Sequence, residues 1–186
     1  MKAGVSRRHF LKGAGICISV TVAGQIVTMT PAQAFEENIP LQVLNKRQAQ
    51  TLAALAEVLV PGAKRSGIVQ FIDSQLSIDA PDSLLMLRYL GVPAPYDRFY
   101  TASLNSLESI TNFQQDKHFS ELDAEQQTKL AEQMVEAKLS MWNGPPSPFF
   151  HFVLRSDAAD VVYGTPAGFE KLGVPYMPHI MPPPLT

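Results

Sequence analysis

The chain has 186 residues, of which 46% are hydrophobic and 17% are charged, and its formal net charge is −2. No basic stripe is present that could displace counterions from phosphates, which argues against nucleic acid as a partner. The single cysteine, Cys17, excludes an intramolecular disulfide, a haem attached through C-x-x-C-H and an iron–sulfur cluster held by this chain alone.

Residues near the amino terminus have the pattern of an export signal. Arg7, Arg8, Phe10, Leu11 and Lys12 match the twin-arginine pattern S-R-R-x-F-L-K. A twin-arginine signal directs folded cargo across the membrane. The pattern therefore predicts export to the periplasm through the twin-arginine translocon.

An apolar run follows this motif over residues 14–29 and contains no charged residue. Ala32 and Ala34 form a small-residue A-x-A site, which predicts cleavage by signal peptidase after Ala34. The sequence thus divides into a signal peptide, residues 1–34, and a mature domain, residues 35–186. The alternative is an uncleaved membrane anchor, although polar residues dilute the run and it is barely long enough to span a bilayer.

The mature domain keeps eleven basic and seventeen acidic residues, hence a net charge of −6. Its length is that of one ordinary domain with a core of its own. Because Cys17 lies in the leader, the mature domain contains no cysteine at all.

Helical spacing of apolar residues predicts an all-α, compact single domain. Asn45 is expected to cap a first helix that Pro61 and Gly62 end, and Asp123 with Gln126 resembles a capping box. Ser147 followed by Pro148 suits the start of a last long helix that ends at residues 164–166. The apolar positions at this spacing are Leu52, Leu55, Ala56, Leu59, Ile68, Phe71, Ile72, Leu76, Phe99, Tyr100, Leu104, Leu107, Ile110, Leu130, Met134, Ala137, Met141, Phe149, Phe152, Val153, Ala159 and Tyr163.

Residues 175–186 form a proline-rich tail that can neither continue a helix nor enter a central strand. We expect this tail to be extended. It either lies along a neighbouring protein or folds back over the helices of its own chain.

Residues that could carry chemistry are dispersed. His118, His151 and His179 lie far apart and show no metal-ligand spacing. Asp157 and Asp160 share a helical face, which we interpret as a hydrated or interface patch with near-normal pKa values rather than a general acid/base pair. The sequence therefore predicts no catalytic, cofactor-binding or metal-binding residue in this chain.

Three blocks resemble the gluconate 2-dehydrogenase subunit 3 family. "LAALAEVLVPGAKRSGIVQFIDSQL" (residues 52–76) is similar to the family pattern L-x-x-L-x-x-x-L-x-P-G-A-x-x-x-G-V-x-x-F-I-D, and it is the most specific of the three. "FSELDAEQQTKLAEQMVE" (119–136) continues the likeness. "VVYGTPAGFEKLGVPYMP" (161–178) is similar to the family's closing block, although Val162 replaces a common aromatic, and Tyr176 with Met177 replaces a glycine.

The resemblance implies a non-catalytic small subunit of a dehydrogenase complex. Its partners would be a large catalytic subunit that holds FAD and oxidises a sugar, polyol or sugar acid, and a multi-haem cytochrome c subunit that passes electrons onward. The small subunit binds neither cofactor. It would escort the leaderless catalytic subunit through the translocon and remain with it in the periplasm, associated with the inner membrane. The substrate stays open, because that pocket belongs to another chain.

Aromatic and methionine residues are favoured at the centre of such an interface. We expect the closing segment, residues 163–184, to lie along the catalytic subunit. Phe150 falls off the main apolar face of its helix and is a candidate surface anchor. The predicted interface set is Phe150, Tyr163, Phe169, Tyr176, Met177, Ile180 and Met181.

Two other functions stay open from the residues alone. One is a free-standing periplasmic enzyme, which requires a cleft with perturbed titratable groups. The other is an envelope binding protein that its uncut leader tethers to the membrane.

Overall fold

The computed structural model describes residues 15–22 and 24–175. The expectation of a largely helical fold is confirmed. The helices are α2 (Pro31–Glu36), α3 (Lys46–Leu59), α4 (Ile68–Leu76), α5 (Met86–Tyr89), α6 (Asp97–Gln115), α7 (Ala124–Val135), α8 (Ser147–Tyr163) and α9 (Pro166–Lys171), with 3-10 turns η1 (Ala80–Asp82) and η2 (Phe119–Glu121). No helix in the described part combines the length and the apolar character that a membrane span requires.

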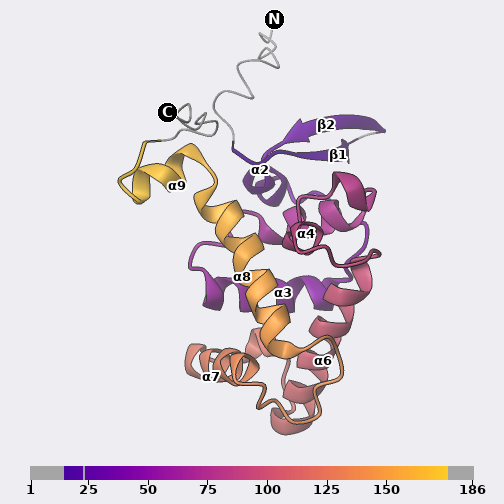
Figure 1. The fold of residues 1–186 in the computed structure, drawn as a ribbon, viewed down its shortest axis with the longest axis vertical. Coiled ribbons are helices and arrows are strands. Elements are labelled where there is room, and N and C mark those ends of the chain that lie inside the picture. Colours follow the sequence, from indigo (N-terminus) through magenta and orange to yellow (C-terminus); the bar gives the residue numbers. More distant parts are fainter. Residues whose placement is uncertain (1–14, 23, 176–186) are drawn as a thin grey trace, which may run out of the picture.

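Helix α8 runs along the molecule and holds the others together. It contacts α3, α4, α5, α6, α7 and α9. Figure 1 shows α8 crossing in front of α3, with α7 and the end of α6 at one pole and the hairpin, α2 and α9 at the other. The core therefore lies around α8 and α3.

Local capping fixes two helix starts where the sequence predicts them. The Asn45 side chain accepts a hydrogen bond from the backbone N–H of Gln48 at 2.9 Å, and Asp123 accepts one from Gln126 at 2.8 Å. Both are complete capping boxes, with the glutamine side chain bonded back to the cap residue. The third start differs by one position, because Pro146 is the cap of α8 and the Ser147 hydroxyl donates instead to the Met134 carbonyl.

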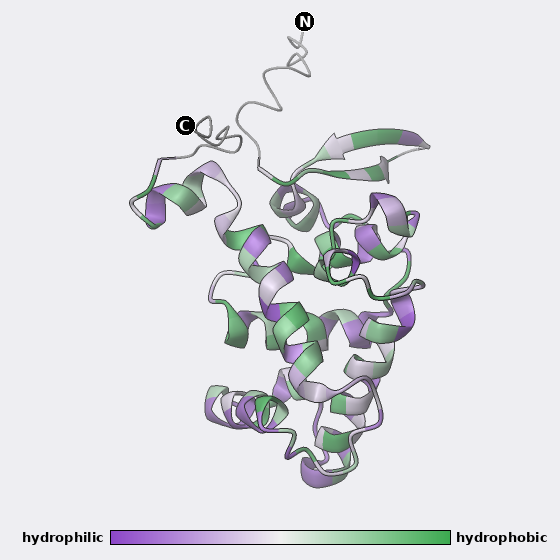
Figure 2. Ribbon diagram, in the orientation of Figure 1, coloured by the Kyte–Doolittle hydropathy of each residue, from purple (hydrophilic) through white to green (hydrophobic). Residues whose placement is uncertain are grey.

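A two-stranded antiparallel sheet is the main departure from the all-α expectation. Strands β1 (Ile18–Val22) and β2 (Gln25–Met29) pair in the register Ile18↔Met29 to Val22↔Gln25. Ile18 and Val20 are buried while Ser19 and Thr21 are exposed, so β1 alternates as a half-buried strand does. The apolar run predicted as part of a signal peptide is thus folded into a hairpin, which Figure 2 shows as mainly hydrophobic.

The buried face of α8 also differs from the prediction. Phe150, expected as a surface anchor, is fully buried, and its ring centroid lies 5.7 Å from Phe99 and 6.0 Å from Tyr100. Phe152, expected to face the core, is 43% exposed. Because α8 packs against neighbours on most sides, its apolar residues spread around the helix and mark no single stripe.

Candidate functional site

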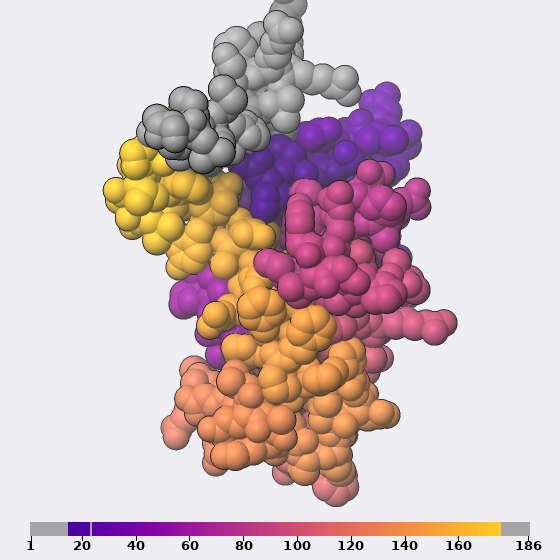
Figure 3. Space-filling model, viewed as in Figure 1, coloured from indigo at the N-terminus to yellow at the C-terminus, as the bar shows by residue number. Residues whose placement is uncertain are grey.

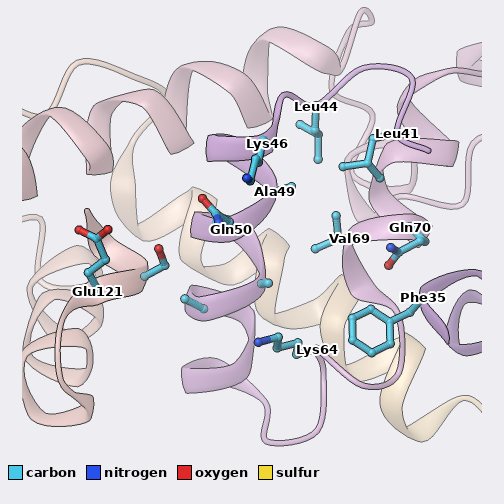
Figure 4. Close-up of a pocket in the computed structure, with 13 residues that line it drawn as sticks. Phe35, Leu41, Leu44, Lys46, Ala49, Gln50, Lys64, Val69, Gln70 and Glu121 are labelled. Carbon is cyan, nitrogen blue, oxygen red and sulfur yellow. The ribbon is translucent and has the colours of Figure 1, made fainter. Parts of the chain in front are cut away.

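A groove of about 790 Å³ opens beside α3. Its walls come from α2, the loop before α3, α3 itself, the turn after α3, α4 and η2 (Figure 4). The lining residues are Phe35, Leu41, Leu44, Lys46, Ala49, Gln50, Ala53, Ala54, Lys64, Val69, Gln70, Ser120 and Glu121.

Small residues on α3 create the floor of the groove. Ala49 and Ala53 stand four residues apart and so lie on one face of the helix. The opposite face carries Leu52 and Leu55, which are fully buried in the core. A helix that places leucine inward and alanine outward leaves room for a side chain of another segment.

Asp73 positions the wall that precedes α3. Its carboxylate accepts three backbone N–H groups, from Gln42 at 2.7 Å, Val43 at 2.9 Å and Leu44 at 2.8 Å. The side chain is buried, and charge-assisted hydrogen bonds of this kind are stronger than neutral ones. The F-I-D block of the sequence therefore holds Leu41 and Leu44 against the groove.

Glu57 fixes the turn that follows α3. Its two oxygens accept the backbone N–H groups of Gly62 and Lys64, each at 2.9 Å. Gly62 has φ +97°, a conformation that L side chains rarely adopt, and Ala63 is fully buried. The P-G-A block thus forms a rigid corner that brings Lys64 to the edge of the groove.

Gln70 leaves an unsatisfied polar atom in this region. The side-chain oxygen of Gln70 is buried and has no hydrogen-bond partner among the described residues. Most buried polar atoms in proteins are paired, because an unpaired one costs about 1–3 kcal/mol. Gln70 lines the groove from α4, but its oxygen is covered, so the side chain has to turn before this oxygen can accept a hydrogen bond from a group that enters.

Charged residues form the rim rather than the floor. Lys46 begins α3, Lys64 lies in the turn after α3 and Glu121 lies on η2, at three separate places around the groove (Figure 4), while the floor is alanine and leucine. The groove is equipped to bind an apolar segment with a hydrogen-bond donor.

The prediction of a hydrated patch at Asp157 and Asp160 is wrong for Asp157. This side chain is fully buried, where it accepts a hydrogen bond from the Tyr100 hydroxyl and one from the Met86 N–H at 2.7 Å. Burial raises the pKa of Asp157 to about 7, against the lowering effect of its hydrogen bonds. Asp160 belongs to an exposed residue position, yet partial burial of its carboxyl group also raises its pKa, so the expected near-normal pKa is wrong for both carboxylates.

The histidines are not brought together. His118 is the cap residue of η2, and its Nδ1 lies 2.8 Å from Glu108, which also accepts from the Thr51 hydroxyl and the Phe119 N–H. His151 lies half-buried on α8, and burial lowers its pKa. Within the described residues no group of three His, Cys, Asp or Glu side chains could hold a metal ion. His179 lies outside those residues.

The predicted interface and signal residues have varied places. Tyr163 ends α8 and Phe169 lies on α9, both half-buried. Ala32 and Ala34 lie inside α2. Tyr176, Met177, Ile180 and Met181, together with Arg7, Arg8, Phe10, Leu11 and Lys12, lie outside the described residues.

Sequence reasoning missed the groove and the residues that shape it. Asp73 did carry a signal, because a single acid inside the apolar stretch "IVQFIDSQL" indicates a buried partner. No sequence signal pointed to Gln70, because the burial of its oxygen depends on loops that approach from elsewhere in the chain.

Comparison with known proteins gives one match. The model of the family described as gluconate 2-dehydrogenase subunit 3 matches residues 46–182, which include α3 through α9. Searches of curated proteins and of solved structures find no significant match. Because the family model covers well over half of the chain, the protein belongs to the gluconate 2-dehydrogenase subunit 3 family.

Proposed function

We propose that this protein is the non-catalytic small subunit of an FAD-dependent sugar, polyol or sugar-acid dehydrogenase complex in the periplasm. The observation that carries the proposal is the family match over residues 46–182. The catalytic large subunit holds FAD and oxidises the substrate, and a multi-haem cytochrome c subunit accepts the electrons. This chain stabilises the catalytic subunit and takes no part in the redox step.

Export is the second part of the proposed role. The chain carries the twin-arginine pattern at Arg7 and Arg8, and a folded body with a continuous hydrophobic core follows it. A catalytic subunit without a leader has to bind a signal-bearing partner before it can cross the membrane folded. The small subunit supplies that signal and then keeps the complex at the inner membrane.

The groove beside α3 is the surface that we assign to the catalytic subunit. It offers an apolar floor at Ala49 and Ala53, a charged rim, and the unpaired oxygen of Gln70. Obligate interfaces bury apolar area at their centre and place charges at the edge. The PGA and FID blocks, which carry the family likeness, build two of its walls through Glu57 and Asp73.

Deletion of this chain in its host tests the proposal as a whole. We expect the catalytic subunit to be absent from the periplasmic fraction and the sugar-dependent reduction of quinone to be lost. Material purified through the tagged small subunit should show flavin and haem bands in its visible spectrum. An active dehydrogenase in the periplasm of the deletion strain contradicts the proposed role.

A charge placed in the groove tests the assigned surface. Ala53→Glu puts a carboxylate on the floor, and a desolvated unpaired charge costs more than about 2 kcal/mol at an interface centre, a loss of more than tenfold in affinity. Ala124→Glu, the same change at an exposed site on α7, is the control. Equal retention of the catalytic subunit by both variants, with unchanged melting temperatures, contradicts the assignment to the groove. Deletion of residues 175–186 then tests the closing segment separately.

A further inference from the structure

The hairpin and α2 are packed as part of the hydrophobic core, although they belong to the predicted leader. Ile18, Val20, Met29 and Ala34 are all buried, and they join the same cluster as the residues of α3 and α4. β1 and α2 both contact α4. Figure 3 shows this segment seated directly on the part of the molecule around α4.

Two glycines let this segment approach the domain more closely than any other residue would permit. A Cβ on Gly67 would lie 2.0 Å from the Pro31 carbonyl oxygen, and one on Gly15 would lie 2.0 Å from the Gly164 carbonyl oxygen. Gly67 and Gly164 belong to the part of the chain that the family model matches. Backbone-to-backbone contact at two separate points fixes the segment in one position.

The predicted cleavage site is folded and covered. Thr30 and Gln33 form a complete capping box that starts α2, and Ala34 donates its N–H to the Thr30 carbonyl at 3.0 Å. The Ala34 carbonyl accepts the N–H of Ile39 at 3.0 Å, and its side chain has 0% exposure. On the other side of the bond, Phe35 forms a wall of the groove. Proteases cut exposed, locally unfolded segments, whereas the Ala34–Phe35 bond lies in a helix beside a buried side chain.

We infer that the folded chain hides the Ala34–Phe35 bond from signal peptidase and keeps residues 15–34 as a structural part of the domain. Signal peptidase can hydrolyse the Ala34–Phe35 bond only after α2 unwinds and the hairpin leaves α4. The domain on this reading begins before residue 35. The inference concerns processing of the chain itself and does not depend on the identity of its partner.

Cleavage of the purified full-length chain tests the inference directly. The native protein, a peptide of residues 1–40 and the variant Gly67→Ala are incubated with purified signal peptidase in detergent micelles, and intact mass is followed. We expect the peptide to be cut after Ala34 and the native chain to be cut more than about tenfold more slowly, because opening is required. Gly67→Ala should be cut faster than the native chain, since its methyl group displaces Pro31.

Gly91→Ala is the matched control, because Gly91 also has positive φ but a Cβ there meets no atom within 4 Å. It should be cut as slowly as the native chain. Cutting of the native chain at the rate of the peptide overturns the inference. A peptide that the peptidase does not cut also overturns the inference, because the site would then be no substrate even when it is unfolded. If Gly67→Ala does not fold, the comparison of native chain and peptide still decides.

Intact mass in cells supplies the second measurement. The chain recovered from the periplasmic complex should retain residues 15–34, and a mass that begins at Phe35 overturns the inference. Absence of the chain from the periplasm would instead contradict the proposed export function. The two failures are therefore distinguishable.

Discussion

Asp157 shows how the fate of one residue depends on neighbours that are distant in sequence. Tyr100 on α6 and the Met86 N–H at the start of α5 both donate to its carboxylate, so α5, α6 and α8 meet at one buried group. Asp160, one turn later, is exposed. The sequence places both carboxylates on one helix face but cannot tell which of them other elements will cover.

The burial of Asp157 predicts an unusual pH dependence. Because its folded-state pKa is raised from 3.8 to about 7, the folded chain binds a proton that the unfolded chain releases. Its contribution to stability is complete below pH 3.8 and is lost as the pH rises toward 7. The free energy of unfolding of the native chain, relative to Asp157→Asn, should fall by up to about 4 kcal/mol across this window.

Urea denaturation at intervals from pH 4 to pH 8 measures this difference. Asp160→Asn, on the exposed side of the same helix, is the control and should follow the native chain much more closely. A difference between the native chain and Asp157→Asn that stays flat with pH would show that this carboxyl does not titrate in the window.

At the scale of elements, signals between near neighbours in sequence are the reliable ones. The caps at Asn45 and Asp123 and the helix end at Gly164 could be predicted, because each depends on bonds within a few residues. The hairpin could not be predicted, because the apolar character of "ISVTV" and "QIVTM" suits a signal peptide as well as it suits a pair of strands. What decides is contact with α4, which no local pattern contains.

Helix α8 offers the sharpest test of an element's orientation. Phe150→Ala removes a ring packed against Phe99, Tyr100 and Trp142, and such a loss costs about 3–5 kcal/mol of unfolding free energy. Phe152→Ala removes an exposed ring and should change stability by less than about 0.5 kcal/mol. Thermal or urea unfolding distinguishes them. Equal losses would mean that α8 is rotated from the orientation described.

At the scale of the whole molecule, the groove is lined by residues from six segments, and this explains why no single sequence motif predicts it. Gln50 and Gln70 both line it, yet only Gln70 has a buried, unpaired oxygen. That difference arises from how α4 meets the loop before α3. The family blocks in the sequence indicate where the groove lies, but only the packing of the folded chain shows that Gln70 carries the unpaired oxygen.

Gln70→Leu separates stability from binding. In the isolated chain this change removes an unsatisfied buried oxygen, so the melting temperature should stay equal or rise. In the complex it removes an acceptor, and affinity for the catalytic subunit should fall about fivefold, the equivalent of one hydrogen bond. Gln50→Leu, at the exposed edge, is the control. A destabilised chain with unchanged affinity would contradict a binding role for Gln70.

The carboxylate of Asp73 has a consequence for the motions of the chain. The N–H groups of Gln42, Val43 and Leu44 lie in a loop, where amides normally exchange with solvent deuterium within seconds, yet a buried side chain of α4 holds all three. They become free only when α4 moves away from the start of α3. The loop and the two helices therefore open as a single cooperative unit, and these amides should exchange as slowly as those inside α4.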